Sequence, residues 1–507
     1  MSVAPPGPRS AAAGAGRPHG GAPGFAFAIL LLYALTTYGG IRSPDGEVVY
    51  RSCEALGARG TFAVAEGLEW RGFGTAPGRD GHFYPVFGPL QTVACVPFDR
   101  LGAVWLGESE VRAERTPAGI SYHVDRGLFT AVRGGRPAAP LPHARRFFAS
   151  WLNVVAGAAA ALLFLLLARP VAGGREAALY AALLCASGSL AWPYAGTFFS
   201  EPLAGALAVG ALALLVRTDP RLVPAPAAGP VAAAGAGLLA GLSTTAHLTS
   251  ALFLPPFALY AAAGAPAGRR GRRAAAFLAG TVPPLAALAL YDQARFGALL
   301  ETGRGVDPAA AAALGYGRFT APWEGLAGLL GSSGKGLFFY CPAVLLGLGA
   351  WPALRRRSPA LAWTLAGTAL LRVGFVAARS DWHGGFALGP RLLVTLVPFL
   401  LLPVAAWLAE EPRRWRVAGL VLLAAAAQQL YFALAEPFVY LHLTNRPDGD
   451  WAWAVSPLLH LWEAPLAPFW LARSGLPVAL VWLAGALLLL PLLGLATARL
   501  ARRAAGA

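Results

Sequence analysis

The stretch SWLNVVAGAAAALLFLLLAR (residues 150–169) decides the class of fold, because it holds no charged residue before its final Arg169. A helix needs about 20 such residues to cross the hydrocarbon core of a bilayer. Similar runs recur along the chain, and together they predict an all-α, polytopic membrane protein with about twelve spans. The others are expected at roughly 25–38, 177–192, 199–216, 229–243, 247–263, 274–291, 336–354, 360–378, 389–408, 416–434 and 475–497.

The composition favours the same class. The chain has 507 residues, of which 56% are hydrophobic and 13% are charged, and its mean hydropathy is +0.55. These values are typical of polytopic membrane proteins. The formal net charge of +16 would suggest nucleic-acid binding in a soluble protein. Here the arginines cluster in short connections between apolar runs, so we expect contact with membrane lipids and no nucleic-acid partner.

The arginines also predict the orientation in the membrane. They occur in every second connection between apolar runs, and the opposite short connections near 192–199 and 244–247 have none. The positive-inside rule therefore predicts that both termini are cytoplasmic. The loops 41–149, 192–201, 292–335, 379–391 and 435–474 would then be extracytoplasmic. The arginines concerned are Arg169, Arg175, Arg217, Arg221, Arg269, Arg270, Arg272, Arg273, Arg355, Arg356, Arg357, Arg413, Arg414 and Arg416.

Two segments differ in composition from the apolar runs. Residues 1–23 are rich in Pro, Gly, Ala and Ser, and we expect a disordered cytoplasmic tail there. The large outer loop 41–149 contains two stretches with helical character, at 45–57 and 87–102, and a β-like alternation near 103–132.

Asp45 and Glu47 are the first candidates for chemistry. They lie in Ser43-Pro44-Asp45-Gly46-Glu47, directly after the first apolar run. A carboxylate at the outer membrane surface is suited to act as a general base or to anchor a metal ion. Alternatively, Asp45 caps a helix that begins at this point, because acidic residues are favoured at helix N-termini. The two interpretations are compatible.

Glu201 lies at the outer end of a span, in a very short loop, and is followed by Pro202. Burying a carboxylate there costs a few kcal/mol, so we expect it to face a polar cavity. The alternative is a residue that only starts a helix, with Pro202 in the first turn.

The stretch SDWHGGFALGPR (residues 380–391) brings Asp381, His383 and Arg391 to the mouth of another span. Arg391 is suited to hold a phosphate through two hydrogen bonds. The alternative is an interfacial loop with a belt Trp and a snorkelling Arg. Lys335, in GSSGKG (residues 331–336), is a second candidate for phosphate, although this loop lacks the full pattern of a nucleotide-binding loop.

Two further ionisable residues are placed within or next to apolar runs. Arg372 falls inside the run at 360–378, so we expect it to face the interior of the bundle. His247 lies at the tip of the turn between two runs, where it either joins an outer site or has a structural role.

Four cysteines are present. Cys185 and Cys341 fall in apolar runs, and we expect them to be small core residues. Cys53 and Cys95 share the first large outer loop, where an oxidising compartment permits a disulfide. The alternative is a pair of unbonded thiols.

Taken in order, several motifs resemble those of polyprenyl-phosphate-sugar-dependent glycosyltransferases with the GT-C fold. The nearest group is similar to glycosyltransferase family 39, which is related to protein O-mannosyltransferases. The resemblance covers about 25–408. It rests on Ser43-Pro44-Asp45, GRDGHFYPVFG (78–88), FSEP (199–202), LETG (300–303), GKGLF (334–338) and WHGG with GPR within 382–391.

The resemblance implies a catalytic membrane module over 24–408, followed by C-terminal helices and an outer loop over 409–507. It implies a sugar donor on a polyprenyl phosphate and an acceptor glycan, lipid or protein outside the cytoplasm, at the plasma (inner) membrane. Asp45 would be the general base and Glu201 a second carboxylate. Arg391 and Lys335 would offset the charge of the leaving phosphate.

The resemblance also puts Tyr84, His383 and Asp381 among the substrate-binding residues. The chain departs from the family pattern at Gly46, where a second acidic residue is common, so either Asp45 or Glu47 could take the proton. The segment 103–137 looks like an insertion. The outer carboxylates could hold a divalent cation, but their spacing demands none. The main alternative function is a transporter or flippase for lipid-linked sugars.

Overall fold

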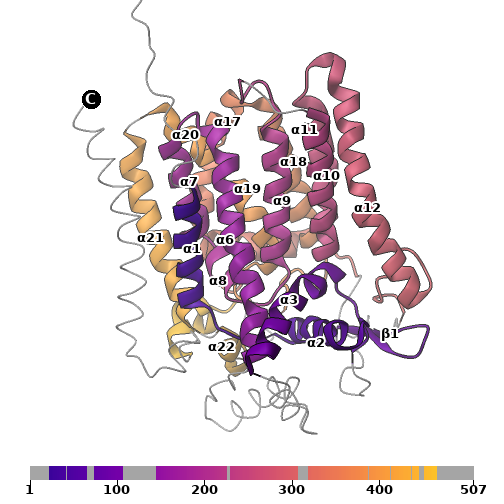
Figure 1. Ribbon diagram of the computed structural model, residues 1–507. Coiled ribbons are helices and arrows are strands. Elements are labelled where there is room, and N and C mark those ends of the chain that lie inside the picture. The colour runs from indigo at the N-terminus through magenta and orange to yellow at the C-terminus, as the bar shows by residue number, and fades with distance from the viewer. Residues whose placement is uncertain are drawn as a thin grey trace, which may run out of the picture.

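The computed structural model describes residues 22–41, 43–64, 74–106, 144–224, 229–306, 318–385, 387–411, 413–435, 437–444 and 450–464. Figure 1 shows a bundle of long helices, with shorter elements gathered at one end. The continuous helices are α1 (Ala22–Thr36), α6 (Ala144–Ala172), α7 (Arg175–Ser187), α9 (Glu201–Val216), α10 (Gly229–Ala246), α12 (Arg270–Phe296), α18 (Pro359–Ala377) and α21 (Arg414–Leu434).

Three other segments of the bundle are interrupted. They begin or bend at prolines, which lack the backbone N–H that a continuous helix needs. The first is η2 (Leu248–Phe253) with α11 (Leu254–Ala263). The second is α15 (Leu337–Tyr340), α16 (Ala343–Gly349) and α17 (Trp351–Arg357). The third is η4 (Arg391–Leu396), α19 (Val397–Leu401) and α20 (Pro403–Glu410).

The predicted spans agree with this bundle. Within the residues that the structure describes, each expected apolar run coincides largely with helical residues, whereas the run at 475–497 lies outside them. Five helical segments of the described chain are long and apolar enough to cross a membrane, and three shorter ones are apolar. The five are Arg145–Ala172, Ala267–Phe296, Pro359–Ala377, Arg391–Glu410 and Arg414–Leu434; the shorter ones are Ala22–Thr36, Glu201–Val216 and Leu248–Ala263.

Close approach of backbones holds the bundle together. Helices α10 and α12 meet at small residues, where a Cβ on Gly237 would lie 1.9 Å from the carbonyl oxygen of Phe277. On the other helix, a Cβ on Gly280 would lie 2.0 Å from the carbonyl oxygen of Ala234. Small residues at such crossings are the usual way to pack helices in a membrane, because lipid provides no hydrophobic drive between them.

The smaller elements lie at the end of the bundle where α2, α3, α8 and α22 are labelled in Figure 1. The expected helices at 45–57 and 87–102 are confirmed as α2 (Pro44–Arg59) and α3 (Pro89–Leu106). Between them a hairpin, β1 (Thr75–Pro77) and β2 (Phe83–Pro85), pairs Thr75 with Pro85 in antiparallel register. Most of the β-like stretch expected at 103–132 lies outside the described residues.

The remaining short elements are α8 (Ala191–Ala195), η3 (Ala267–Arg269), α14 (Pro322–Gly331), α22 (Pro437–Thr444), η5 (Trp453–Val455), α23 (Pro457–His460) and η6 (Leu461–Glu463). The arginine-rich end of α17 lies at the opposite end of the bundle from α2 (Figure 1). There Arg356 and Arg414 both donate to Glu410, at 2.7 Å each.

Candidate active site

Arg391 joins the two outer carboxylates that the sequence singled out. Its Nη2 lies 2.8 Å from Oδ2 of Asp45, and its Nε lies 2.8 Å from Oε1 of Glu201. The side chain of Glu201 is fully buried, whereas that of Asp45 is 23% exposed. Two carboxylates thus share one guanidinium, one on a buried side and one on an open side.

Local sequence explains the position of Asp45. Ser43 is the N-cap of α2, with its Oγ accepting a hydrogen bond from the Gly46 N–H at 3.0 Å, and Pro44 occupies the first turn. The interpretation of Asp45 as the cap is therefore wrong, because the Ser43 hydroxyl has taken that role. Asp45 instead lies in the first turn, where its carboxylate is stabilised by the helix dipole and remains available to Arg391.

Glu201 begins α9, with Pro202 in the first turn, as expected. The loop before it is fixed by Asn153 of α6, whose side-chain amide donates to the carbonyls of Thr197 at 2.8 Å and Phe199 at 2.6 Å. The ring of Phe199 lies 3.7 Å from the guanidinium carbon of Arg391, in a cation–π arrangement. These contacts leave the guanidinium little freedom to turn away from the carboxylates.

The backbone before Arg391 is also held closely. Gly389 has a φ of +60°, and a Cβ there would lie 2.7 Å from the ring of Tyr340. The Leu388 carbonyl accepts a hydrogen bond from the Tyr194 hydroxyl at 2.7 Å. Only glycine meets both the backbone angle and the close approach at position 389, so the Gly-Pro-Arg sequence fixes the start of η4.

Glu47 is turned away from this group. Both of its oxygens bond to Arg146, at 2.7 and 3.0 Å, and Oε1 also accepts from Arg51 at 3.0 Å. Its side chain is 3% exposed. The geometry therefore gives Glu47 a structural role between α2 and α6, and Asp45 is the carboxylate that faces the open side.

Lys335 lies in the loop before α15, and its ammonium group is bound by backbone oxygens. Nζ donates to the carbonyls of Gly385 at 2.8 Å and Ala387 at 2.6 Å. The pKa of Lys335 is lowered to about 8. Burial is the main cause, the charge of Asp450 opposes the shift, and the charge of Arg391 adds to it. Lys335 is therefore bound to the loop that leads to Arg391.

Asp381 and His383 lie in the loop that Lys335 holds. Asp381 is paired with Arg379, whose Nε lies 2.6 Å from Oδ1. Nδ1 of His383 accepts a hydrogen bond from the Gly385 N–H at 3.0 Å. Burial lowers the pKa of His383, and the charge of Lys335 lowers it further. The imidazole is therefore neutral near pH 7, with its proton on Nε2.

Tyr84 is not brought to Arg391 by any contact in the structure. It lies on β2, where its hydroxyl donates to Asp80 at 2.7 Å and its ring packs edge-on against Phe296. Burial and the bond to Asp80 raise the pKa of Tyr84 to about 12. The proposed contact of Tyr84 with substrate thus has no support from its position in this hairpin.

Cys53 and Cys95 are neighbours, one on α2 and one on α3. Both are fully buried free thiols within one apolar cluster. Burial raises the pKa of the Cys95 thiol well above its usual range, and a hydrogen bond with Cys53 raises it further. The predicted disulfide remains a prediction, and the proximity that it requires is present.

His247 identifies a cationic region that the sequence indicated only in part. Burial lowers the pKa of His247 well below its usual value, and the charges of Arg372, Arg391, Arg304 and Arg379 lower it further. Its Nδ1 lies 3.0 Å from the hydroxyl of Ser200, the residue before Glu201. Arginines on outer loops are exceptions to the positive-inside pattern, and that exception was the available signal for Arg304 and Arg379.

Arg372 is fully buried on α18, as expected, but its hydrogen bonds go to neutral groups. Its Nε donates to the Leu392 carbonyl at 2.9 Å, and Nη1 donates to the Thr249 hydroxyl. Among the described residues, Nη2 of Arg372 and Oε2 of Glu201 are buried without a hydrogen-bond partner. Buried polar atoms of this kind normally bind ordered water or substrate.

A divalent cation finds no ready site in the described part of the chain, where no three His, Cys, Asp or Glu side chains are grouped as metal ligands.

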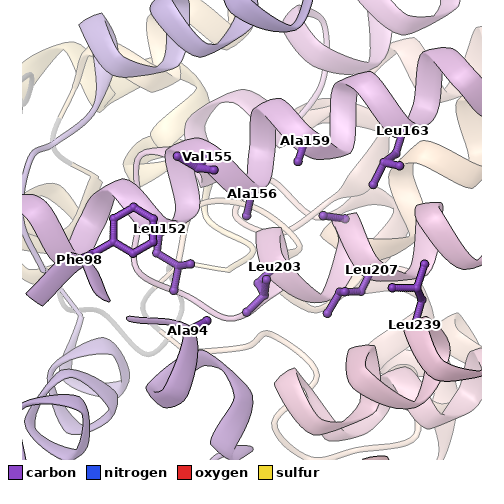
Figure 2. A pocket seen from close by; sticks show the side chains of 11 residues that line it. Ala94, Phe98, Leu152, Val155, Ala156, Ala159, Leu163, Leu203, Leu207 and Leu239 are labelled. Atoms are coloured by element: carbon purple, nitrogen blue, oxygen red, sulfur yellow. The ribbon is translucent and has the colours of Figure 1, made fainter. Parts of the chain in front are cut away.

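A groove of about 410 Å³ lies between α3, α6, α9 and α10. Figure 2 shows its apolar side chains, among them Phe98, Leu152, Leu203 and Leu239. Such a lining suits a hydrocarbon chain.

Comparison with known proteins identifies the fold. No family model and no curated protein matches the chain. Among solved structures, the chain is similar to ArnT from Cupriavidus metallidurans bound to undecaprenyl phosphate, with a TM-score of 0.50 and 13% identity over 87% of this chain and 77% of that chain.

The chain has the GT-C fold. At this identity the likeness shows the fold alone. ArnT in the apo state gives a TM-score of 0.49 and 15% identity over 93% of this chain and 76% of that chain. The Archaeoglobus fulgidus oligosaccharyltransferase tethered to an acceptor peptide gives a TM-score of 0.46 and 13% identity over 83% of this chain and 55% of that chain. The GT-C fold confirms the fold class expected from the motifs.

Proposed function

We propose that this chain is an integral membrane glycosyltransferase that moves a sugar from a polyprenyl-phosphate donor to a hydroxyl of an acceptor glycan, lipid or protein. The observation that carries the proposal is the contact of Arg391 with both Asp45 and Glu201 at one end of a GT-C fold. ArnT, which has this fold, is described as bound to undecaprenyl phosphate.

In the proposed reaction, Asp45 is the general base. Its Oδ2 lies 2.8 Å from Nη2 of Arg391, and its side chain is 23% exposed. The exposed carboxylate can take the proton of the acceptor hydroxyl. The acceptor oxygen bonds to the anomeric carbon as the bond from that carbon to the phosphate oxygen breaks. The phosphate leaves with the electron pair, and the configuration at the anomeric carbon is inverted.

Arg391 would bind the phosphate of the donor. An arriving phosphate competes with Asp45 for Nη2, because charge-assisted bonds to phosphate are strong. The buried bond to Glu201 would keep the guanidinium in place during that exchange. Donor binding would thus release the Asp45 carboxylate for the acceptor. Lys335 and the arginines near His247 would offset the negative charge that develops on the leaving group.

We further propose that the site lies outside the cytoplasm at the plasma (inner) membrane, with both termini inside. The support is the separation of the arginine-rich end of α17 from α2 along the bundle (Figure 1). The apolar groove begins beside Leu203, two residues after Glu201, so we propose that a lipid chain of the donor lies there.

The proposal can be tested in vesicles that contain the purified protein and undecaprenyl phosphate carrying a radiolabelled hexose. Envelope extract supplies the acceptor. The proposal predicts label in a glycosidic product that resists release by mild acid, which cleaves the donor. Movement of the labelled donor across the bilayer without such a product would support the transporter alternative and contradict the enzyme.

A further inference from the structure

An aromatic and polar group lies on the loops next to Arg391, outside the contacts described for the reaction. The rings of Trp382 and Trp451 meet at 63°, with centroids 6.1 Å apart. Trp382 is buried and fits against Gly328, where a Cβ would lie 2.1 Å from the indole. Trp451 is 45% exposed. A fixed indole thus supports one whose surface is open.

The two loops that carry these rings are joined by hydrogen bonds from the residue pair Gly334 and Lys335. The Gly334 N–H donates to the Asp450 carbonyl at 2.9 Å. The adjacent Lys335 donates through Nζ to the carbonyls of Gly385 and Ala387. The segment after Trp382 and the segment before Trp451 are therefore held by the same loop, so their side chains keep a defined spacing.

Two hydrogen-bonding groups accompany the rings. Nδ1 of His383 accepts from Gly385, which leaves an Nε2–H donor on the neutral imidazole. The Asp450 carboxylate has no ion pair with any residue that the structure describes, and its charge acts on His383 and Lys335. A donor, an acceptor and an aromatic face are together the groups that a sugar ring requires, because its hydroxyls bond in both directions and its C–H face is apolar.

This group borders the proposed reaction centre. Gly384, with a φ of +70°, packs against Arg391, because a Cβ at Gly384 would lie 3.6 Å from Cβ of the arginine. His383 and Arg391 therefore lie on adjacent parts of one loop surface. A sugar next to a phosphate held by Arg391 would border the loop of His383, to which the segment of Asp450 and Trp451 is joined through Gly334 and Lys335.

We propose that Trp382, His383, Asp450 and Trp451 form a carbohydrate subsite that binds a sugar ring through the open face of Trp451. The inference rests on the proposed function for the placement of the phosphate at Arg391. The sugar is either that of the donor or a residue of an acceptor glycan. Both have the same chemistry, and binding measurements separate them.

The test is direct binding to the purified full chain in detergent, without any transfer reaction. The probes are undecaprenyl phosphate alone, a set of undecaprenyl phosphates that carry a hexose, an N-acetylhexosamine or a pentose, and an array of bacterial envelope oligosaccharides. If the subsite binds the donor sugar, at least one glycosylated lipid binds more tightly than undecaprenyl phosphate. Trp451→Ala then weakens the binding of that glycosylated lipid by about three- to tenfold.

For an acceptor glycan, Trp451→Ala instead removes binding to the array and leaves the difference between lipids unchanged. Trp462→Ala, which removes another exposed indole of the outer segment, should change neither. Trp451→Phe, which keeps an aromatic face, should retain most of the binding. Undecaprenyl phosphate alone should bind every variant equally, which controls for folding.

The subsite is contradicted if the wild type binds no sugar in either arm, or if Trp451→Ala and Trp462→Ala behave alike. Sugar binding that depends on Trp451 in a protein without transfer activity would keep the subsite and reject the glycosyltransferase. If the protein transfers sugar but Trp451→Ala changes no sugar binding, the glycosyltransferase is kept and the subsite is rejected.

Discussion

Arg391 and Glu201 are 190 residues apart in the chain and meet at 2.8 Å in the interior of the bundle. Glu201 has no exposed surface, so this bond lies on the buried side of the site. It orients the same guanidinium whose other nitrogen reaches Asp45. The structure thus separates a buried carboxylate from one that faces the open side of the site.

Glu201→Gln should therefore weaken donor binding more than the proton transfer. The glutamine cannot supply a charge to hold Nε of Arg391, and breaking a buried charge pair costs about 3–5 kcal/mol. We expect the KM for a lipid-linked sugar to rise by at least tenfold, with a smaller change in kcat. Glu410→Gln is the matched control, because Glu410 also binds an arginine but lies at the other end of the bundle.

Glu47→Gln should lower stability and spare the chemistry. Its bond to Arg146 is buried and joins α2 to α6, whereas its bond to Arg51 lies within α2. A loss of about 3–5 kcal/mol is expected from an uncompensated Arg146, and it is measured as a lower midpoint of thermal unfolding in detergent. The rate per folded molecule should stay close to that of the wild type. A rate loss as large as that of an Asp45 variant would make Glu47 the base.

The charge of Lys335 gives a dependence on pH. Its pKa in the folded protein is about 8, so the ammonium is present below pH 8 and is lost above it. If Lys335 helps to bind phosphate, the KM for the donor should rise as the pH passes through about 8. Lys335→Arg, which stays protonated, should flatten the profile.

Stability should change in the opposite direction. Because the folded pKa of Lys335 lies below that of the unfolded chain, the unfolded chain binds more protons between about pH 8 and 10.4. The Lys335 contribution to the free energy of unfolding therefore rises with pH in that window.

A donor KM that is flat through pH 8 in the wild type would exclude Lys335 from the phosphate site.

Cys53 and Cys95 should be joined in protein taken from an oxidising compartment. The two thiols are buried in one apolar cluster between α2 and α3. A bridge over this loop would contribute about 3–4 kcal/mol in the chain-entropy model. Alkylation of the denatured protein followed by mass spectrometry counts the free thiols. Reduction should release two more and lower the unfolding midpoint; four free thiols before reduction would reject the bridge.

Much of the bundle could be predicted from the sequence, because a bilayer requires long apolar runs and satisfies backbone groups only within helices. The interruptions were less evident. The run expected at 336–354 is divided into α15, α16 and α17, and prolines at 342 and 352 lie at the two breaks. The hairpin of β1 and β2 gave no strong signal, since each strand has three residues.

The candidate site was predicted in part. Asp45, Glu201 and Arg391 were named from their positions at the outer ends of spans, and the structure brings them into contact. Which carboxylate faces the open side could not be deduced, because Arg146, the partner of Glu47, lies 99 residues away. Tyr84 was carried over with a motif, and only the fold reveals that the hairpin holds it against Asp80.

The central claim is that Asp45 takes the proton of the acceptor. Transfer of a labelled hexose from undecaprenyl phosphate should be measured for the wild type, Asp45→Asn and, as a control, Asp80→Asn, whose carboxylate binds Tyr84 on the hairpin. Asp45→Asn should bind the donor and lower kcat by about 10²–10⁴-fold, whereas Asp80→Asn should stay near the wild type. Full activity in a correctly folded Asp45→Asn protein would contradict the account.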